Sequence, residues 1–400
     1  MTIIVWKGGL IMGELRFRHS LANSRLRNIA IEKIRYFSSM ELSFEWTEDE
    51  LILIYSSEMS ITDVQKLEEM TKIFLESNQK IDRFFLKESH ISTNSSERRN
   101  YYVKWIREHL GDLFNDIQNS KITDEGKILT DIGVPMYSNE VIKFKKNINL
   151  MISEFATYHF NALTYETPTF LSQENAKKAG YFNTGSQHMY FVSEVKKDLE
   201  NFGNYYDHTS SGKLKDVSDY LCDSGFVLTP AVCLHVYPIL SDTEIVNSPE
   251  IPYRVYDVLG LAYRDEGNNF NESDRFREFQ VHELVFFGEE SSLESLERKA
   301  TDFLLAIFDC LNIAGELEVA NDIFFGNQEK NLLVKQILSN DKIEFVGLKS
   351  GKSLASINRH QDKFTSNFNI KSNHGKLVSM CLGFGIDRII NELLLSKGGL

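Results

Sequence analysis

An arginine near the C-terminus lies in a pattern that suits phosphate binding. Glycines flank Phe384, and Arg388 follows in the first turn of a segment with helical periodicity. The apolar residues with this periodicity are Ile386, Ile389, Ile390 and Leu393. An arginine at a helix start offers a planar fork of donors beside free backbone amides, an arrangement that binds phosphate. A Gly-x-Gly run is also typical of a tight turn before a core helix, so the pattern alone leaves both interpretations open.

A second group of chemically capable residues lies on a predicted hairpin. A buried strand predicted over 255–263 is followed by a polar loop and a second strand predicted over 275–286. The charged and aromatic residues of this hairpin are Arg264, Glu266, Arg275, Phe279 and Glu283. By the period of two from Arg275 onward, one side of the hairpin is expected to carry Arg264, Arg275, Phe279 and Glu283. A charged surface hairpin has the same pattern.

The order of these segments resembles motifs 2 and 3 of the class II aminoacyl-tRNA synthetases. Members of that family catalyse attack of an amino acid carboxylate on the α-phosphate of ATP. The resemblance implies that Arg264, Glu266 and Arg388 are catalytic, with Arg264 stabilising the charge that develops on that phosphate. It also implies an ATP site, with Mg²⁺ on the nucleotide, in which Phe279 packs on adenine. The residues implied to bind ATP are Arg264, Arg275, Phe279 and Arg388.

Two cysteines adjoin the same segments. Cys233 ends the run Leu-Thr-Pro-Ala-Val-Cys, and Cys381 stands just before the Gly-Phe-Gly run. Two thiolates and the Glu283 carboxylate are suitable ligands for a zinc ion that keeps a fourth position open. An open zinc can take the amino group of an α-amino acid and orient its carboxylate toward ATP. Spacing alone does not distinguish such a site from two cysteines buried as small apolar residues.

Further segments narrow the resemblance to the amino acid:carrier protein ligases, which are homologues of the zinc-containing seryl-tRNA synthetases of methanogens. These segments are residues 228–233, 275–288, 318–326, 357–364 and 381–388. The resemblance extends from about Gly126 to the C-terminus. It implies an α+β fold with a class II antiparallel sheet flanked by helices, in a protein that is usually a homodimer.

This resemblance also implies a reaction. A small amino acid would form an adenylate and then pass to the phosphopantetheine thiol of a carrier protein. The residues implied to bind zinc are Cys233, Glu283 and Cys381. The residues expected to line the substrate cleft are Asn358, His360 and Asp322. No cysteine or carboxylate stands at ligand spacing from His360, so His360 is not predicted to bind metal.

Two other functions stay open. The first is a seryl-type aminoacyl-tRNA synthetase, although a net charge of −13 disfavours tRNA as the main partner. The second is an inactive paralogue that binds an amino acid or adenylate, which the presence of Arg264, Arg275 and Arg388 argues against. Carrier proteins are themselves acidic, so we expect a local cationic face on an acidic ligase. The lysines considered for it are Lys143, Lys145, Lys146, Lys177 and Lys178.

The remaining elements define two predicted domains. Residues 1–122 are predicted to form a small α+β domain of unknown role, with a hairpin over 41–56 and helices after Thr62 and over 101–117. Residues 123–400 form the predicted catalytic domain. Its expected elements are a long helix through 142–155, a strand similar to motif 1 over 162–171, a helix over 293–311, strands over 315–320 and 343–348, and a polar run over 353–364.

The composition predicts a cytoplasmic protein. The 4 cysteines show no paired spacing, which indicates a reducing compartment, and no apolar run is long enough to cross a bilayer. We expect no signal peptide, because the N-terminal segment contains a Lys-Gly-Gly break and no small-residue cleavage pattern. The same break precedes Met12, so either Met1 or Met12 is expected as the translation start.

Overall fold

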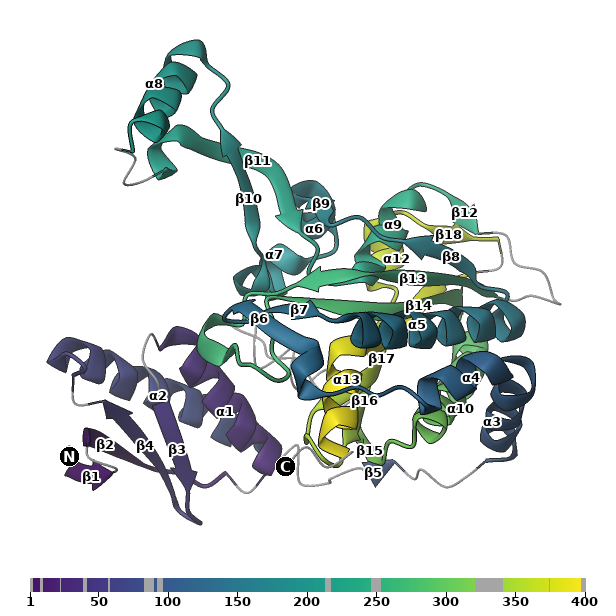
Figure 1. Cartoon of the computed structure of the whole chain (residues 1–400), viewed down its shortest axis with the longest axis horizontal. Coiled ribbons are helices and arrows are strands. Elements are labelled where there is room, and N and C mark those ends of the chain that lie inside the picture. Colours follow the sequence, from purple (N-terminus) through teal and green to yellow (C-terminus); the bar gives the residue numbers. More distant parts are fainter. Residues whose placement is uncertain are drawn as a thin grey trace.

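A computed structural model of the 400-residue chain provides the structure (Figure 1). It describes residues 3–7, 10–21, 23–38, 42–56, 58–82, 90–91, 96–212, 217–245, 253–320, 341–373 and 375–396. Asp322, one of the three expected cleft residues, lies outside these ranges. None of the helices in the described ranges combines the length and the apolar composition that crossing a bilayer requires.

An eight-stranded sheet forms the centre of the molecule. In spatial order its strands are β5 (His90–Ile91), β15 (Gly315–Val319), β16 (Lys342–Gly347), β17 (Ser353–Gln361), β19 (Leu377–Gly385), β14 (Glu278–Glu289), β13 (Tyr253–Tyr263) and β8 (Leu163–Glu166). Neighbouring strands are antiparallel, except that β8 is parallel to β13. The predicted hairpin and the predicted antiparallel sheet are therefore confirmed.

The alternation of side chains along β14 divides the protein into two cores. Leu284 and Phe286 lie in a core beneath helices, whereas Val285 and Phe287 lie in a separate core on the opposite face. The helices of the first face are α3 (Glu97–His109), α4 (Gly111–Gln118), α5 (Asn139–Phe160), α10 (Glu290–Leu311) and α13 (Ile386–Ser396). The second face carries η4 (Val232–His235), α9 (Val236–Ile239) and α12 (Lys363–Asn367), seen above β13 in Figure 1.

The long helices form where the apolar spacing predicts them. The apolar residues that recur at helical spacing along α10 are all buried: Leu293, Leu296, Ala300, Leu304, Ile307 and Leu311. The Phe303 ring in that helix stacks on Phe155 of α5 with centroids 3.9 Å apart. The polar run over 353–364, in contrast, was not predicted to be a strand, yet it contains the central strand β17. Its polar residues serve both faces: Arg359 pairs with Glu297 of α10, and His360 faces the second core.

A third core belongs to the N-terminal segment. It lies between a four-stranded sheet and two helices. These elements are β1 (Ile3–Lys7), β2 (Leu10–Arg18), β4 (Glu50–Ser56), β3 (Leu42–Trp46), α1 (Ser24–Phe37) and α2 (Ile61–Asp82). Trp105 and Ile106 of α3 instead pack in the core of the large sheet. We therefore propose a domain boundary between α2 and α3 rather than at residue 122.

An arm projects from the second face of the sheet (Figure 1). Strands β10 (Phe191–Val195) and β11 (Leu221–Leu228) pair as its stem, β9 (Phe170–Ser172) joins them at the base, and α8 (Leu199–Ser210) lies at its tip. The smaller elements are β6 (Lys127–Asp131), β7 (Val134–Tyr137), α6 (Gln173–Lys178), α7 (Tyr181–Thr184), β12 (Glu244–Ile245) and β18 (Lys371–Ser372).

Candidate active site

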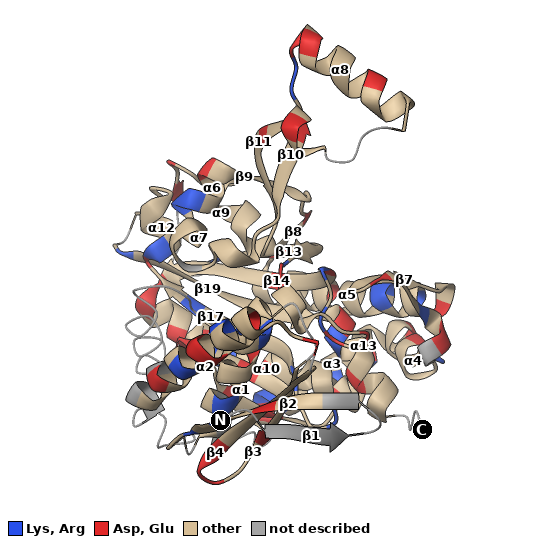
Figure 2. Ribbon diagram, turned by 90° about the vertical axis from the view of Figure 1, so that its left-hand side faces the viewer, with Lys and Arg blue, Asp and Glu red and all other residues tan. Residues whose placement is uncertain are grey.

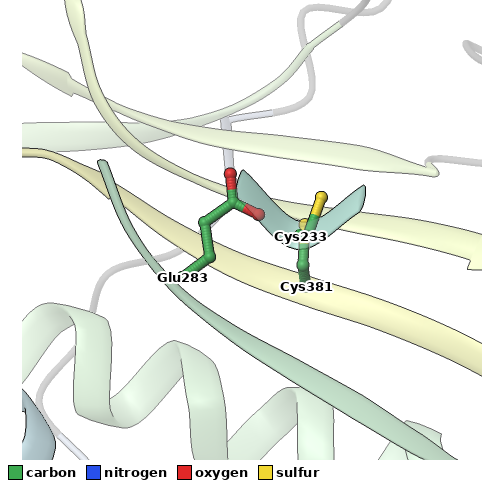
Figure 3. A group of neighbouring side chains, drawn as sticks. All are labelled: Cys233, Glu283 and Cys381. Carbon is green, nitrogen blue, oxygen red and sulfur yellow. The ribbon is translucent and has the colours of Figure 1, made fainter. Parts of the chain in front are cut away.

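Three buried side chains from distant parts of the chain meet on the second face of the sheet. Cys233 comes from η4, Glu283 from β14 and Cys381 from β19, and their sulfur and oxygen atoms all lie within 4.8 Å of one another (Figure 3). Because Glu283 pairs with Gly383 across the two strands, a Cβ at position 383 would come within 3.3 Å of the Glu283 side chain. Glycine at this position therefore leaves room for the carboxylate.

The chemistry of this cluster fits a metal ion. Zinc bonds cysteine sulfur at about 2.3 Å and carboxylate oxygen at about 2.1 Å, so three atoms this close need only small shifts to share one ion. One carboxylate oxygen of Glu283 is buried without a hydrogen-bond partner, which is costly unless a cation satisfies it. Burial and the neighbouring Cys381 sulfur raise the pKa of Glu283 to about 8.

Polar groups around Cys381 favour its thiolate form. The Cys233 thiol donates to the Cys381 sulfur, which lowers the pKa of Cys381 and raises that of Cys233. Asn358 Nδ2 donates to Cys381 Sγ over 3.6 Å, and His360 Nε2 lies 3.5 Å from the same sulfur. The other ring nitrogen of His360 lies 2.8 Å from the hydroxyl of buried Tyr237. Asn358 and His360 thus contact a candidate ligand, in the way that neighbouring donors orient metal ligands.

Zinc binding is expected to release about two protons at pH 7. Glu283, with a pKa of about 8, and Cys233, with a raised pKa, are protonated at that pH and must lose their protons to bind metal. Zinc affinity should therefore fall as the pH falls, and proton release should decline as the pH rises through 8. Calorimetric titration of zinc into chelator-treated protein, repeated in buffers of different ionisation enthalpy, measures the number of protons released. Release of no protons would contradict the assigned ligand set.

The first of three arginines lies beside this cluster. Arg264 follows β13, its Nε donates to the carbonyl of Pro230 over 2.9 Å, and its guanidinium lies 5.4 Å from the centroid of the Phe279 ring. The positive charge of Arg264 also acts on Glu283, where it favours the ionised carboxylate. The candidate metal ligands and the predicted catalytic arginine therefore occupy one site.

The other two arginines converge on Glu266. Arg275 Nη1 lies 2.8 Å from Glu266 Oε2. Burial alone would raise the pKa of Glu266, but Arg275, Arg264 and Arg388 outweigh it, and the pKa is lowered. Arg388 is itself partly buried, and burial together with Arg275 lowers its pKa, although a guanidinium stays charged. The charged residues of predicted motifs 2 and 3 thus form one cluster.

Asp387 anchors the helix start that carries Arg388. Its carboxylate accepts hydrogen bonds from Tyr137, from the backbone amide of Gln280 and from Lys145, whose Nζ is 2.8 Å away. The interpretation of Lys145 as a surface lysine is therefore wrong, because its ammonium neutralises a buried carboxylate. Of the other lysines in the expected cationic face, Lys143 pairs with Asp116 and Lys178 with Glu174. Their charges are partly neutralised at the surface.

The chain is similar in sequence to two kinds of ligase. No protein-family model matches the chain. It is 26% identical over 249 residues to the type-2 serine–tRNA ligase of Methanopyrus kandleri, covering 58% of this chain and 47% of the relative. It is 27% identical over 188 residues to amino acid–(acyl-carrier-protein) ligase 2 of Bradyrhizobium diazoefficiens, covering 46% of this chain and 55% of the relative. The chain thus spans about half the length of these relatives.

A solved structure shares the fold. The crystal structure of A. aeolicus tRNASec in complex with M. kandleri SerRS aligns with a TM-score of 0.59 and 18% identity, covering 98% of this chain and 76% of that chain. The homologues of this protein are therefore type-2 serine–tRNA ligases and amino acid–(acyl-carrier-protein) ligases. Its α+β core has a fold like that of the class II aminoacyl-tRNA synthetases, as the sequence predicted.

Proposed function

We propose that this protein, with its class II synthetase core, activates a small amino acid with ATP and Mg²⁺ and transfers it to the phosphopantetheine thiol of a carrier protein. The observation that carries the proposal is the buried Cys233–Glu283–Cys381 cluster beside the arginines that surround Glu266. A zinc ion held by this cluster would supply a Lewis-acidic position for the substrate amino group.

In the first step the residues of the cleft act on ATP. An oxygen of the amino acid carboxylate attacks the α-phosphorus, the bond to the β-phosphate oxygen breaks, and pyrophosphate leaves. Arg264 is suited to stabilise the charge on the α-phosphate, since it lies next to the candidate metal ligands. Phe279 provides a flat surface for adenine, and Arg275 and Arg388 provide donors for the polyphosphate. These side chains are partly buried, which strengthens each interaction because less water competes.

The second step transfers the aminoacyl group to a thiol. The phosphopantetheine sulfur attacks the carbonyl carbon of the adenylate, AMP leaves, and the thiol proton passes to solvent. A thioester results. The net charge of −13 disfavours tRNA, because binding of tRNA depends on neutralising its phosphates. The projecting helix α8 contains Glu200 and Asp207 but no lysine or arginine, so this helix itself brings neither residue to a phosphate backbone (Figure 2).

Seryl-tRNA synthesis is the second candidate, favoured by the likeness to the M. kandleri ligase. A labelled amino acid offered separately to phosphopantetheinylated carrier protein and to total tRNA distinguishes the two. We expect an acid-stable, thiol-labile label on the carrier and none on tRNA. If the label appeared on tRNA alone, the carrier-protein proposal would be wrong and seryl-tRNA synthesis would take its place. The unmodified carrier, which lacks the thiol, is the matched control.

We further propose a homodimer. Strand β8 lies at the end of the sheet, pairs with β13 and with no other strand of the described ranges, and leaves the side chains of Leu163 and Tyr165 exposed. An exposed apolar edge strand is an unfavourable surface for a monomer, and a second copy can cover it.

A further inference from the structure

The N-terminal domain reaches into the cluster of arginines. Helix α1 lies against η5 (Gly267–Asn269), the loop after Arg264 and Glu266, and the two segments adjoin in Figure 1. The side-chain amide of Asn269 donates to the backbone carbonyl of Glu32 over 3.1 Å. The contact is close: Gly267 has a φ of +58°, and a Cβ there would lie 2.4 Å from the carbonyl oxygen of Tyr36.

An ion pair also joins helix α1 to the catalytic domain. The carboxylate of Glu32 binds Nη2 of Arg275, while Nη1 of the same guanidinium binds Glu266. Arg275 is 12% exposed in its side chain and Glu32 27%, so water screens the pair only partly. Arg275 is therefore engaged on both terminal nitrogens before any nucleotide is considered.

The ion pair with Glu32 changes the balance of charge around Arg275. Asp274 and Glu266 already face Arg275 and Arg388 from the catalytic domain. Glu32 adds one more carboxylate beside Arg275, which the positive charge of Arg35 on the same helix also faces. Replacing Glu32 by an uncharged residue would make the surroundings of Arg275 more positive by one charge, and so more attractive to a polyphosphate.

We propose that helix α1 is a gate that ATP displaces. Glu32 occupies the donors of Arg275 that the terminal phosphates of ATP would use, so binding of those phosphates breaks the contact between α1 and the catalytic domain. This inference rests on the proposed function, in which Arg275 holds the polyphosphate. It gives the N-terminal domain a role: its position against the η5 loop depends on whether ATP is bound.

Nucleotide binding by the full chain tests the gate. Calorimetry with a non-hydrolysable ATP analogue and Mg²⁺ should show about three- to tenfold tighter binding to Glu32→Gln than to wild type, because removing the carboxylate charge frees Arg275. Binding of AMP, which lacks the terminal phosphates, should not change. Glu69→Gln, an exposed carboxylate on α2 of the same domain, is the matched control and should bind as wild type does.

A second measurement uses the unaltered protein. The ATP analogue should speed hydrogen exchange of the α1 amides (Ser24–Phe37), and AMP should not. Equal or weaker analogue binding by Glu32→Gln would overturn the gate and make Glu32 a residue that holds Arg275 or Mg²⁺ in place. That result leaves the proposed function intact, provided that Arg275→Ala weakens analogue binding. No analogue binding to any of these proteins would contradict both proposals.

Discussion

The Cys381→Ala protein is expected to contain no stoichiometric zinc and to show no amino-acid-dependent exchange of pyrophosphate into ATP. Cys381 lies with Cys233 and Glu283 in the buried cluster, and the alanine removes one of the three candidate ligands found in the described part of the chain. Loss of one thiolate weakens a three-residue zinc site severely, and the substrate amino group then has no Lewis acid to bind. Glu283→Ala should give the same result.

The matched control is Cys310→Ala. Cys310 is also buried, but it lies in α10 on the opposite face of the sheet, so this variant tests the cost of deleting a buried thiol without touching the cluster. It should retain zinc and exchange activity. Elemental analysis and the exchange assay measure both properties on the same samples. Full exchange by a metal-free Cys381→Ala protein would refute the role assigned to zinc.

Arg264→Ala should slow amino acid activation by at least about 100-fold while leaving the fold and the zinc content unchanged. The reason is that Arg264 lies beside both Glu283 and Phe279, where the α-phosphate of a bound ATP would gain charge in the transition state. A donor already fixed at that position stabilises the transition state more than the bound substrate, so the loss should appear mainly in kcat. Single-turnover formation of the adenylate measures it.

Arg254→Ala serves as the control for this prediction. Arg254 lies on the same strand near its other end, about 30 Å from Arg264 along β13 at the usual rise per residue. The Arg254→Ala substitution removes an arginine from the same strand without touching the cluster, so the rate of amino acid activation should stay within about twofold of the wild-type rate. An Arg264→Ala protein as active as this control would contradict the catalytic assignment.

The sequence predicted the parts of the site that depend on local periodicity. The period of two along β14 correctly put Phe279 and Glu283 on one face, and helical spacing put Arg388 at the start of α13. The meeting of Cys233 with Cys381 did not follow from spacing, because the two residues are far apart in the chain. It was expected only through the resemblance to the ligases.

Other features could not be predicted because they depend on tertiary contacts. Helix α3 has an ordinary amphipathic pattern, which does not reveal that Trp105 packs on the large sheet rather than in the N-terminal domain. The pair between Glu32 and Arg275 joins residues 243 positions apart, and neither has a local pattern that indicates a partner. Tyr237, which contacts His360 behind the candidate ligands, reads in the sequence as one more apolar position.

Amino-acid-dependent exchange of labelled pyrophosphate into ATP, measured with each of the twenty amino acids, tests the central claim most directly. The resemblance to the ligases suggests glycine or alanine as substrate. We predict that a small amino acid supports exchange by the zinc-replete protein, that a chelator abolishes the exchange, and that zinc restores it. Absence of exchange with all twenty amino acids in protein shown to contain zinc would contradict the account.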